Sequence, residues 1–491
     1  MTRELPAALY RPDQVAELDR RAIEDFNTPG FELMRRAGAV AYRALRAAWP
    51  GRCHLCVLCG GGNNGGDGYI IAELARRDGL SVDLLYLLDP ARLQGSAAQA
   101  AQRYQDAGGH PQAFDGELPD ECDVIVDAML GTGLQREVAG RYRQAVEAVN
   151  ASLLPVLAVD IPSGLDGATG GVLGAAVRAD VTTTFIGLKA GLVTGEGPAR
   201  TGRLVFADLD VPPGVYDDLP PMAWRRDYDS LYHWFPARAR DTHKGHCGHV
   251  LVVGGDHGTA GAALMAGSAA ARSGAGLVSV ATRGEHAPGF LAARPELMVH
   301  DAQALEALLP RADVLVTGPG LGRGDWGEGL LERVLQFPGP LVLDADALNA
   351  LAERPRRRDH WVLTPHPGEA GRLLGLAAGE VQADRFRALE GLIETYGGTA
   401  VLKGVGTLVG SHGTTPAVCG VGNPGMASGG MGDVLSGVLG GLIAQGLDPD
   451  GAARVGVWLH GAAADRAAAE GERGLLATDL LAPLRALANP D

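Results

Sequence analysis

The stretch Asn423-Pro-Gly-Met-Ala-Ser-Gly-Gly-Met-Gly-Asp433 decides the fold of the second half of this chain, because an apolar run follows it at once. Apolar side chains recur there at every fourth position, which predicts a helix: Val434, Val438, Leu442 and Leu435, Leu439, Ile443. A helix that starts in glycines presents unpaired N–H groups and a partial positive charge, which favour a bound phosphate. The Asp433 carboxylate would then take a proton from an attacking hydroxyl. Alternatively, Asp433 only caps the helix.

The composition is that of an α/β protein with many tight turns: of 491 residues, 72 are glycine, 46% are apolar and 5% are aromatic. This length is enough for about two to four domains. The formal charge of −15 argues against nucleic acid and anionic membranes as partners. No apolar run reaches the roughly 20 residues that span a bilayer, and the start Met1–Pro6 lacks the plan of a secretory signal. We therefore expect a cytoplasmic protein.

Three of the six cysteines share the spacing Cys53-x-x-Cys56-x-x-Cys59, which metal and iron–sulfur sites use. The apolar residues between them predict a buried strand, which cannot turn three sulfurs toward one point. We expect reduced core cysteines here and at Cys122, Cys247 and Cys419.

Two halves separate near residues 211–240, where two proline pairs precede an aromatic-rich stretch. We place the domains at 1–215 and 241–491, with a connector at 216–240. The connector is expected to pack against a domain face through its aromatic side chains: Trp224, Tyr228, Tyr232, Trp234 and Phe235.

Each half alternates short apolar runs with helical spans, a pattern typical of a mainly parallel sheet covered on both faces. In the first half, helices are predicted at 12–25 and 31–48, and strands at 54–59, 82–88, 123–127, 156–160, 181–186 and 203–208. In the second half, strands are predicted at 249–254, 277–281, 314–317, 341–344, 361–364 and 400–403. No sequence repeat relates the halves, so a fusion of two different α/β folds is expected.

The first long strand of the first half ends in Gly60-Gly-Gly-Asn63-Asn64-Gly65-Gly66-Asp67-Gly68, after which a helix is predicted. Such a turn lets a phosphate approach backbone N–H groups, although it is not the Gly-x-Gly-x-x-Gly dinucleotide fingerprint. The two asparagines add amide groups that a tight turn does not need. The alternative is plain turn chemistry, with Asp67 as the helix N-cap.

Two further strands end in the carboxylates of Asp127 and Asp160, and the carboxyl ends of parallel strands face one crevice. The oxygens of Asn64, Asp127 and Ser163 suit an alkali or alkaline-earth cation better than zinc. Asp160 is then left for acid–base work. Either aspartate taken singly also fits a turn.

The loops that follow strands in the second half are equally rich in glycine and polar residues. They include Gly254-Gly-Asp-His-Gly-Thr-Ala-Gly-Ala262, Thr317-Gly-Pro-Gly-Leu-Gly322, Leu343-Asp-Ala-Asp-Ala-Leu-Asn349, Thr364-Pro-His-Pro-Gly-Glu369 and Lys403-Gly-Val-Gly-Thr407. The last of these predicts a strand–turn–strand that could cradle nucleotide phosphates or ribose.

The first-half motifs at 63–68, 127–134 and 160–164 resemble the NAD(P)H-hydrate epimerase family, also called the YjeF N-terminal domain, whose members interconvert the R and S epimers of hydrated NADH and NADPH. The resemblance implies a Rossmann-like three-layer α/β sandwich, with potassium on Asn64, Asp127 and Ser163 and with Asp160 at the reacting ring. Gly61 departs from the proline of many members. The implied substrate-binding residues are Asn63, Asn64, Gly65, Gly66, Asp67, Gly131, Thr132, Gly133, Leu134, Gln135, Arg136, Glu137 and Asp160.

The second half resembles the ribokinase-like fold and, more narrowly, the ADP-dependent NAD(P)H-hydrate dehydratase domain. This implies that Asp433 is catalytic and deprotonates the C6 hydroxyl of the hydrate, which attacks the terminal phosphate of ADP; NAD(P)H, AMP and phosphate result. The implied nucleotide-binding residues are Lys403, Gly404, Val405, Gly406, Thr407, Gly430, Met431 and Gly432, and the implied substrate-binding residues are Ala262, Gly320, Gly322, His366 and Asp433. Magnesium is expected through water near Glu369 or Asp344. Alternatively, His366 is a turn histidine and Asp344 is structural.

The implied partners are small molecules: the hydrates NADHX and NADPHX, and ADP. A homo-oligomer is also expected. A ribokinase-like small-molecule kinase fused to a dinucleotide-binding regulatory domain would share the glycine-rich helix start but leaves the first half unexplained. A dinucleotide-sensing scaffold would bind without turnover.

Overall fold

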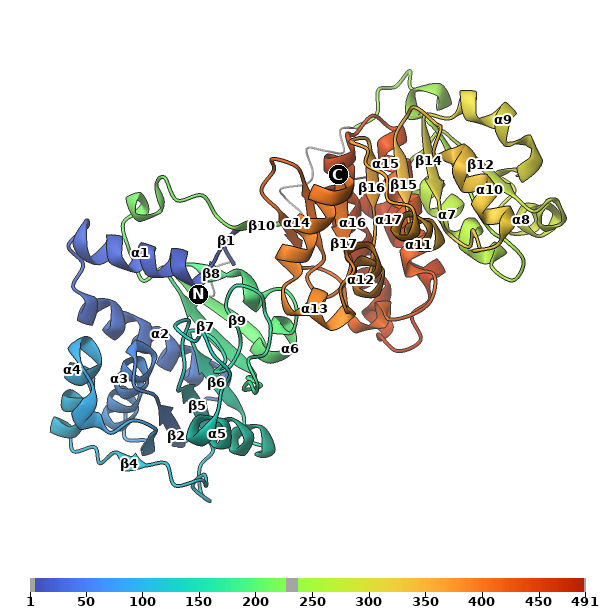
Figure 1. The fold of residues 1–491 in the computed structure, drawn as a ribbon. Helices are drawn as coiled ribbons and strands as arrows, with labels where there is room; N and C mark the ends of the chain where they lie inside the picture. Colours follow the sequence, from blue (N-terminus) through green and yellow to red (C-terminus); the bar gives the residue numbers. More distant parts are fainter. Residues whose placement is uncertain (1–4, 227–236, 490–491) are drawn as a thin grey trace. The chain divides into compact units, whose positions relative to one another are not determined.

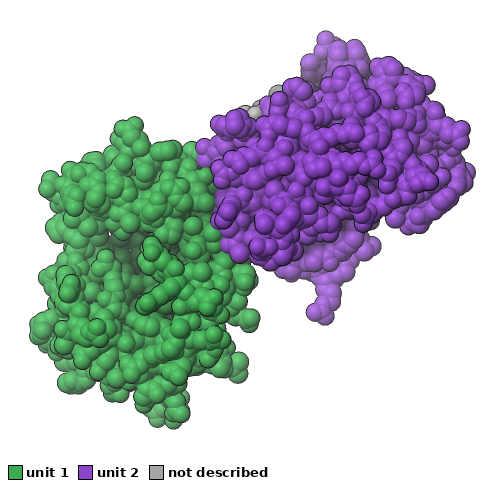
Figure 2. Space-filling view, in the orientation of Figure 1, with its two compact units in different colours: residues 1–224 green, residues 225–491 purple. Residues whose placement is uncertain are grey.

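The structure is a computed structural model that describes residues 5–226 and 237–489. The chain forms two compact units, residues 1–224 and 225–491, which Figure 2 colours separately. The boundary falls inside the segment 216–240 that the sequence predicts as a connector. Trp224 lies in β10 (Ala223–Arg226) and is the register partner of Ala8 in β1 (Ala8–Tyr10). The other connector aromatics, Tyr228, Tyr232, Trp234 and Phe235, lie outside the described residues.

The first unit is built on a parallel sheet in the order β4-β3-β2-β5-β6-β7-β9 (Figure 1). The helices α1, α2, α3 and α4 share one hydrophobic cluster on one face, and α5 contributes to a second cluster on the other. This arrangement confirms the predicted Rossmann-like three-layer sandwich. The strands are β2 (His54–Cys59), β3 (Ser81–Tyr86), β4 (Gln112–Ala113), β5 (Val124–Ala128), β6 (Val156–Val159), β7 (Val181–Phe185), β8 (Leu188–Lys189, which pairs with β1) and β9 (Arg203–Ala207). The helices are α1 (Pro12–Glu24), α2 (Gly30–Ala48), α3 (Asn63–Arg77), α4 (Gly95–Asp106), α5 (Gly140–Ala151) and α6 (Gly197–Thr201).

The cysteine-rich strand β2 separates its sulfurs as the period of a strand requires. Cys56 belongs to the cluster under α5, Cys59 to the cluster under α2 and α3, and Cys53 precedes the strand and is exposed. The three sulfurs therefore do not converge, as the sequence predicts.

In the second unit the strands follow the order β13-β12-β11-β14-β15-β16-β17-β18-β19; the pairs up to β17 are parallel, and β18 and β19 are antiparallel. The strands are β11 (His249–Val253), β12 (Leu277–Thr282), β13 (Met298–Asp301), β14 (Val314–Thr317), β15 (Leu341–Leu343), β16 (Trp361–Leu363), β17 (Thr399–Leu402), β18 (Leu408–Ser411) and β19 (Ala417–Cys419). The helices are α7 (Ala260–Arg272), α8 (Ala287–Ala293), α9 (Leu305–Leu308), α10 (Asp325–Val334), α11 (Ala345–Glu353), α12 (Pro367–Leu374), α13 (Ala378–Ala383), α14 (Arg385–Tyr396), α15 (Met431–Ala444), α16 (Pro449–Ala467) and α17 (Leu481–Leu487). Among the described residues, no helix is long and apolar enough to cross a membrane.

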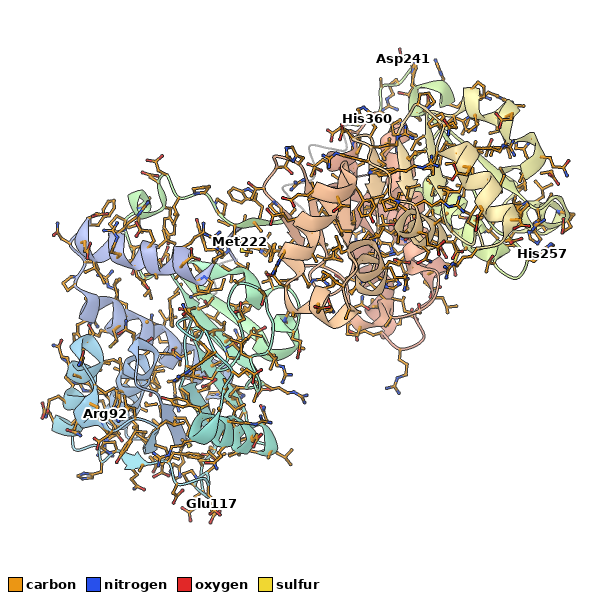
Figure 3. The ribbon with its side chains drawn as sticks, in the orientation of Figure 1. Arg92, Glu117, Met222, Asp241, His257 and His360 are labelled. Atoms are coloured by element: carbon orange, nitrogen blue, oxygen red, sulfur yellow. The ribbon has the colours of Figure 1, made fainter. Side chains whose placement is uncertain are left out.

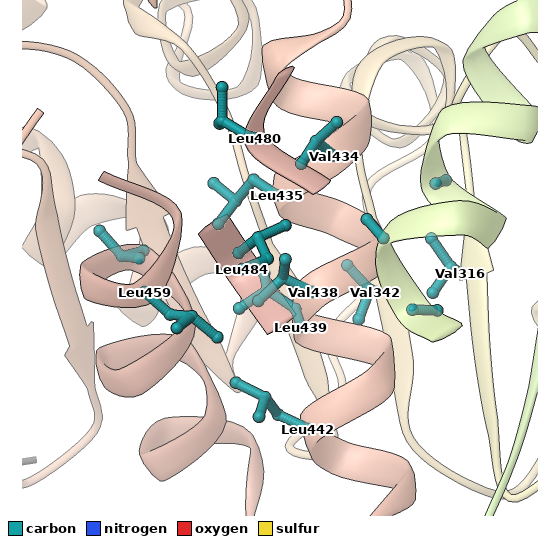
Figure 4. Packing of buried hydrophobic residues seen from close by; sticks show 14 of the residues in the cluster. Val316, Val342, Val434, Leu435, Val438, Leu439, Leu442, Leu459, Leu480 and Leu484 are labelled. Atoms are coloured by element: carbon teal, nitrogen blue, oxygen red, sulfur yellow. The ribbon is translucent and has the colours of Figure 1, made fainter. Parts of the chain in front are cut away.

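Helix α15 is the centre of the second unit. Its apolar side chains pack with those of β14, β15, α16 and α17 (Figure 4), which confirms the helix predicted after Asp433. Glycines face α7: a Cβ on Gly437 would lie 2.0 Å from the Ala266 carbonyl oxygen, and one on Gly441 would lie 2.1 Å from Ser273 Oγ. The two helices therefore touch almost backbone to backbone, and this contact requires glycine.

Two candidate active sites

The first unit holds a cavity of about 970 Å³, lined by residues that follow β2, β5 and β6. The lining includes most of the predicted substrate residues: Asn63, Asn64, Asp67, Gly131, Thr132, Gly133, Leu134, Gln135, Arg136 and Asp160. Gly65, Gly66 and Glu137 are not part of it. A Cβ on Gly65 would lie 2.1 Å from Gly60 O, and one on Gly66 would lie 2.5 Å from Met34 Cε. These two glycines therefore allow close packing behind the cavity wall.

The sequence predicts a loop at residues 63–67, and this prediction is wrong. These residues form the start of α3. The turn itself is Gly60–Gly62, and Gly62 is the N-cap. The alternative role of Asp67 as N-cap is therefore wrong: Asp67 lies inside the helix and is 8% exposed. Burial raises its pKa well above the usual value, and the neighbouring Asp160 and Asp19 add to this. The cavity thus meets a helix start, where backbone N–H groups favour an anionic ligand.

The surroundings of Asn64 fit a cation. Its side-chain amide is buried, and neither its nitrogen nor its oxygen has a hydrogen-bond partner among the described residues; such orphaned groups are rare in folded proteins. The Asp127 carboxylate is fully buried and accepts hydrogen bonds from Ser163 Oγ at 2.6 Å and Ser163 N at 2.8 Å. Burial raises the pKa of Asp127 to about 6, although these bonds oppose it. A bound cation would satisfy the amide oxygen and favour the charged carboxylate.

Two charged residues of this cavity were missed by the sequence analysis. Lys189 at the end of β8 is 1% exposed and forms an ion pair with Asp160. Asp19 on α1 also lines the cavity. The sequence contains a signal for the role of Lys189, because this lysine lies within the apolar run Phe185–Val193. A lysine in a buried segment is seldom without a charged partner, so the run predicts an ion pair.

The second candidate site lies at the start of α15. Gly430 is the N-cap with φ 91°, and no side chain caps this helix. Asp433 lies in the first turn, so the alternative that it caps the helix is wrong. Burial raises the pKa of Asp433 to about 7, with a further contribution from the nearby Asp344 carboxylate. A half-buried carboxyl with a pKa near neutrality beside free helix N–H groups is suited to proton transfer near a phosphate.

A buried charge network lies beneath this helix start. Lys403 Nζ donates to Asp344 Oδ1 at 2.8 Å and lies 3.8 Å from Glu369 Oε2, while Ser436 Oγ donates to Asp344 Oδ2 at 2.7 Å. Burial alone would lower the pKa of Lys403, but Asp344 and Glu369 outweigh it and raise that pKa. A Cβ on Gly432 would lie 3.2 Å from Lys403 Nζ, so the ammonium group sits directly under the glycine turn.

The other predicted residues of the second site occupy turns. Gly320 and Gly322 have φ of 59° and 75°, and Gly322 N donates to Asp346 Oδ2 at 3.0 Å. Gly404, Val405, Gly406 and Thr407 form the tight turn between β17 and β18, and Val405 is 57% exposed. Ala262 lies in the first turn of α7. This helix start follows a loop that contains His257, which Figure 3 labels and whose ring meets that of His286 edge-on at 5.9 Å.

His366 is the N-cap of α12, as the alternative for this residue anticipates. Its Nδ1 accepts from Gly368 N at 3.0 Å, and Glu369 accepts from His366 N at 2.8 Å. The side chain of His366 remains 51% exposed, and its Nε2 lies 3.4 Å from Glu369 Oε1. The sequence analysis missed Arg385, which is fully buried and whose guanidinium donates to Leu402 O at 3.0 Å behind the 403–407 turn.

Two parallel-sheet units, each with a glycine-rich helix start beside an aspartate, define a two-site α/β enzyme for phosphate-bearing ligands. Residues 250–485 match the family profile described as NAD(P)H-hydrate dehydratase, and residues 30–191 match the one described as YjeF-related protein N-terminus. The chain is 50% identical to a Coxiella burnetii bifunctional NAD(P)H-hydrate repair enzyme Nnr over 98% of this chain and 99% of the relative, and 46% identical to the Escherichia coli one over 99% and 95%. The chain therefore belongs to the family of bifunctional NAD(P)H-hydrate repair enzymes.

Two solved structures are similar to the second unit at a TM-score of 0.50. One is a ribokinase-like superfamily protein from Enterococcus faecalis, 30% identical over 54% of this chain and 94% of that chain. The other is the ADP/ATP-dependent NAD(P)H-hydrate dehydratase from Bacillus subtilis co-crystallised with ATP and Mg²⁺, 31% identical over 53% of this chain and 96% of that chain. These likenesses confirm the predicted ribokinase-like fold.

Proposed function

We propose that this protein repairs hydrated nicotinamide cofactors in two steps. The first unit interconverts the R and S epimers of NADHX and NADPHX. The second unit dehydrates the S epimer to NADH or NADPH and converts ADP to AMP and phosphate. The observation that carries the proposal is the start of α15, where Asp433 lies in the first turn, without a capping role, beside the N–H groups of Gly430–Gly432. Burial there raises the pKa of Asp433 to about 7.

In the second site, Asp433 takes the proton of the C6 hydroxyl, and the hydroxyl oxygen attacks the terminal phosphorus of ADP as the bond to AMP breaks. The helix N–H groups face the charge that grows on the transferred phosphoryl oxygens, and such donors are typically worth about 10²–10³ in rate each. The Lys403 ammonium beneath Gly432 adds a fixed positive charge. The ring nitrogen then expels the phosphorylated oxygen, and loss of the C5 proton leaves NAD(P)H.

Lys403 acts in this proposal from below the turn rather than as a direct phosphate ligand, because Asp344 already holds its ammonium group. The nucleotide lies along the turn Gly404–Thr407, with its terminal phosphate on Gly430–Gly432. The nicotinamide hydrate lies toward Ala262, Gly320, Gly322 and His366. Each of these residues belongs to a loop or helix start of the same unit.

Potassium fits the first unit, held by Asn64, Asp127 and Ser163, because the buried Asn64 oxygen has no partner among the described residues. Its charge would fix these residues beside the substrate. Magnesium fits the second site only through nucleotide phosphates and water, because Asp344 and Glu369 accept hydrogen bonds from protein donors. Mg²⁺ commonly binds in this way. The proposal includes the cytoplasmic location and the homo-oligomer expected from the sequence; sedimentation at several concentrations measures the assembly.

The test uses the purified full-length chain, the S epimer of NADPH hydrate, ADP and Mg²⁺. We expect the absorbance band of reduced nicotinamide to return, with one phosphate and one AMP released per NADPH formed. A small-molecule kinase would consume nucleotide without restoring the band, and a sensor would do neither. Either of these two results would overturn the proposal.

A further inference from the structure

The first cavity contains more ionisable groups than the cofactor-repair proposal has used so far. Asp19, Asp67, Asp160 and Lys189 all line it, from α1, α3, the end of β6 and β8. Three carboxyl groups thus share one ammonium group. Their contacts differ, and this difference assigns separate roles to Asp160 and Asp19.

Asp160 is held rigidly. Its φ of 67° places it in the left-handed region, which a non-glycine residue occupies at a cost and usually for a functional reason. Its carboxylate forms an ion pair with Lys189. Lys189 Nζ is itself fixed, because it also donates to Thr184 Oγ1 at 3.1 Å and to Phe185 O at 3.2 Å. Asp160 therefore presents its carboxyl group to the cavity in one orientation, paired with the Lys189 ammonium group.

Asp19 has a different setting. Val15, Asp19 and Ile23 line the cavity at a spacing of four residues, so Asp19 interrupts an otherwise apolar face of α1. Burial raises the pKa of Asp19 to about 6; the Lys189 ammonium opposes this shift and the Asp160 carboxylate adds to it. The charged and titratable groups around it are Asp67, Asp160, Lys189 and Tyr216. Because burial outweighs the opposing Lys189 ammonium group, Asp19 holds a proton more readily than an ordinary aspartate does.

We propose that the first cavity works with two carboxyl groups: Asp160, oriented by Lys189, accepts a proton from the substrate, and Asp19 on α1 donates one. Lys189 is a positioning residue, which acts through Asp160. The proposal rests on the epimerase function proposed for this unit and names the second group that the reaction needs. Two carboxyl groups held in different surroundings are a recurrent arrangement for acid–base pairs.

The reaction balances as a ring opening. Asp160 takes the C6 hydroxyl proton, the oxygen lone pair forms the C6 carbonyl, and the C6–N1 bonding pair moves to N1, which takes the Asp19 proton. The nitrogen pair is a good leaving group because it is conjugated with the ring carboxamide. After rotation about C5–C6, Asp19 recovers the N1 proton, N1 attacks the other face of C6, and the oxygen regains its proton from Asp160. Both carboxyl groups return to their starting states.

The experiment measures epimerisation directly, by chromatographic separation of the R and S forms of NADPH hydrate without ADP, and subtracts the uncatalysed rate. Asp19→Asn should lower kcat by about 10²–10⁴, the range for loss of an acid–base group. The wild-type kcat should fall as pH rises past about 6, because Asp19 then loses its proton, and Asp19→Asn should lack this descending limb. Glu24→Gln, on an exposed position of the same helix, is the matched control and should keep the wild-type rate and profile.

Lys189→Met should lower kcat far more than it changes KM, and Lys189→Arg should restore part of kcat. A merely structural role would lower the melting temperature without this split. If Lys189→Met does not fold, the Asp19→Asn and Lys189→Arg variants still test the proposal. If Asp19→Asn epimerises the substrate with the wild-type rate and pH profile, this inference is overturned while the proposed function stands. The absence of catalysed epimerisation in the wild-type chain would overturn the proposed function of the first unit as well.

Discussion

Replacing Asp433 by Asn should make the second unit more stable at alkaline pH. The same substitution should abolish the ADP-dependent dehydratase activity. Burial raises the pKa of this carboxyl from 3.8 to about 7 in the folded chain. The unfolded chain therefore loses the proton near pH 4 and the folded chain near pH 7, so wild-type stability falls as pH rises through this window. Asparagine has no proton to lose and avoids this destabilisation.

The magnitude follows from about 1.4 kcal/mol per pKa unit. We expect the advantage of Asp433→Asn over wild type to grow by about 2–3 kcal/mol between pH 5 and pH 8, measured by urea unfolding. Asp359→Asn, at an exposed position of the same unit, is the control and should show no such growth. ADP-dependent recovery of NADPH should fall by about 10²–10⁴. An equal stability difference at both pH values, or full activity in Asp433→Asn, would refute the assignment of Asp433 as the buried base.

The remaining predictions concern both units. Asp160→Asn should leave repair of the S epimer intact and slow repair of the R epimer to the uncatalysed epimerisation rate; normal R-epimer kinetics with ADP would remove Asp160 from catalysis. Replacing potassium by sodium should change substrate binding to the first unit, because the buried Asn64 oxygen has no partner among the described residues and a bound cation would contact it; calorimetric titrations that are equal in both salts would contradict this. Gly437→Ala should lower the unfolding free energy by about 1–3 kcal/mol, since its Cβ would lie 2.0 Å from Ala266 O; an unchanged denaturation midpoint would argue against the close helix contact.

Local patterns predicted the fold well. The helix after Asp433 and the buried strand between Cys53 and Cys59 could be predicted because they depend on local signals. These signals are the spacing of apolar residues and the positions of glycines within a few residues of each other. The same holds for the residues that follow β2, β5 and β6, because the carboxyl ends of parallel strands converge whatever the details of packing. These rules brought Asn64 and Asp160 to one cavity without any knowledge of side-chain contacts, whereas Asp127 is fully buried and is not part of its lining.

The interpretations that failed depend on contacts across the fold. Whether Asp67 caps α3 depends on where the helix begins. The helix begins at Asn63 with Gly62 as its N-cap, which is earlier than the glycine-rich sequence indicates. The pairing of Lys403 with Asp344 joins residues 59 positions apart, and that of Lys189 with Asp160 joins residues 29 positions apart. No local pattern links such residues. The ionic partners of a site are therefore the part that sequence reasoning finds last.

The contact between α15 and α7 has a consequence for substrate choice. Because Gly437 and Gly441 bring the two helix axes together, the helix start at Gly430–Gly432, where we propose the phosphate binds, and the helix start at Ala262 are joined by one close contact. Two helices in such close contact cannot separate without losing that packing, so we expect the distance between the two helix starts to stay fixed when ligands bind. Val405, in the turn that we propose holds the nucleotide, is 57% exposed and lies outside this helix contact, so efforts to change the preferred nucleotide should begin there and leave the two helices untouched.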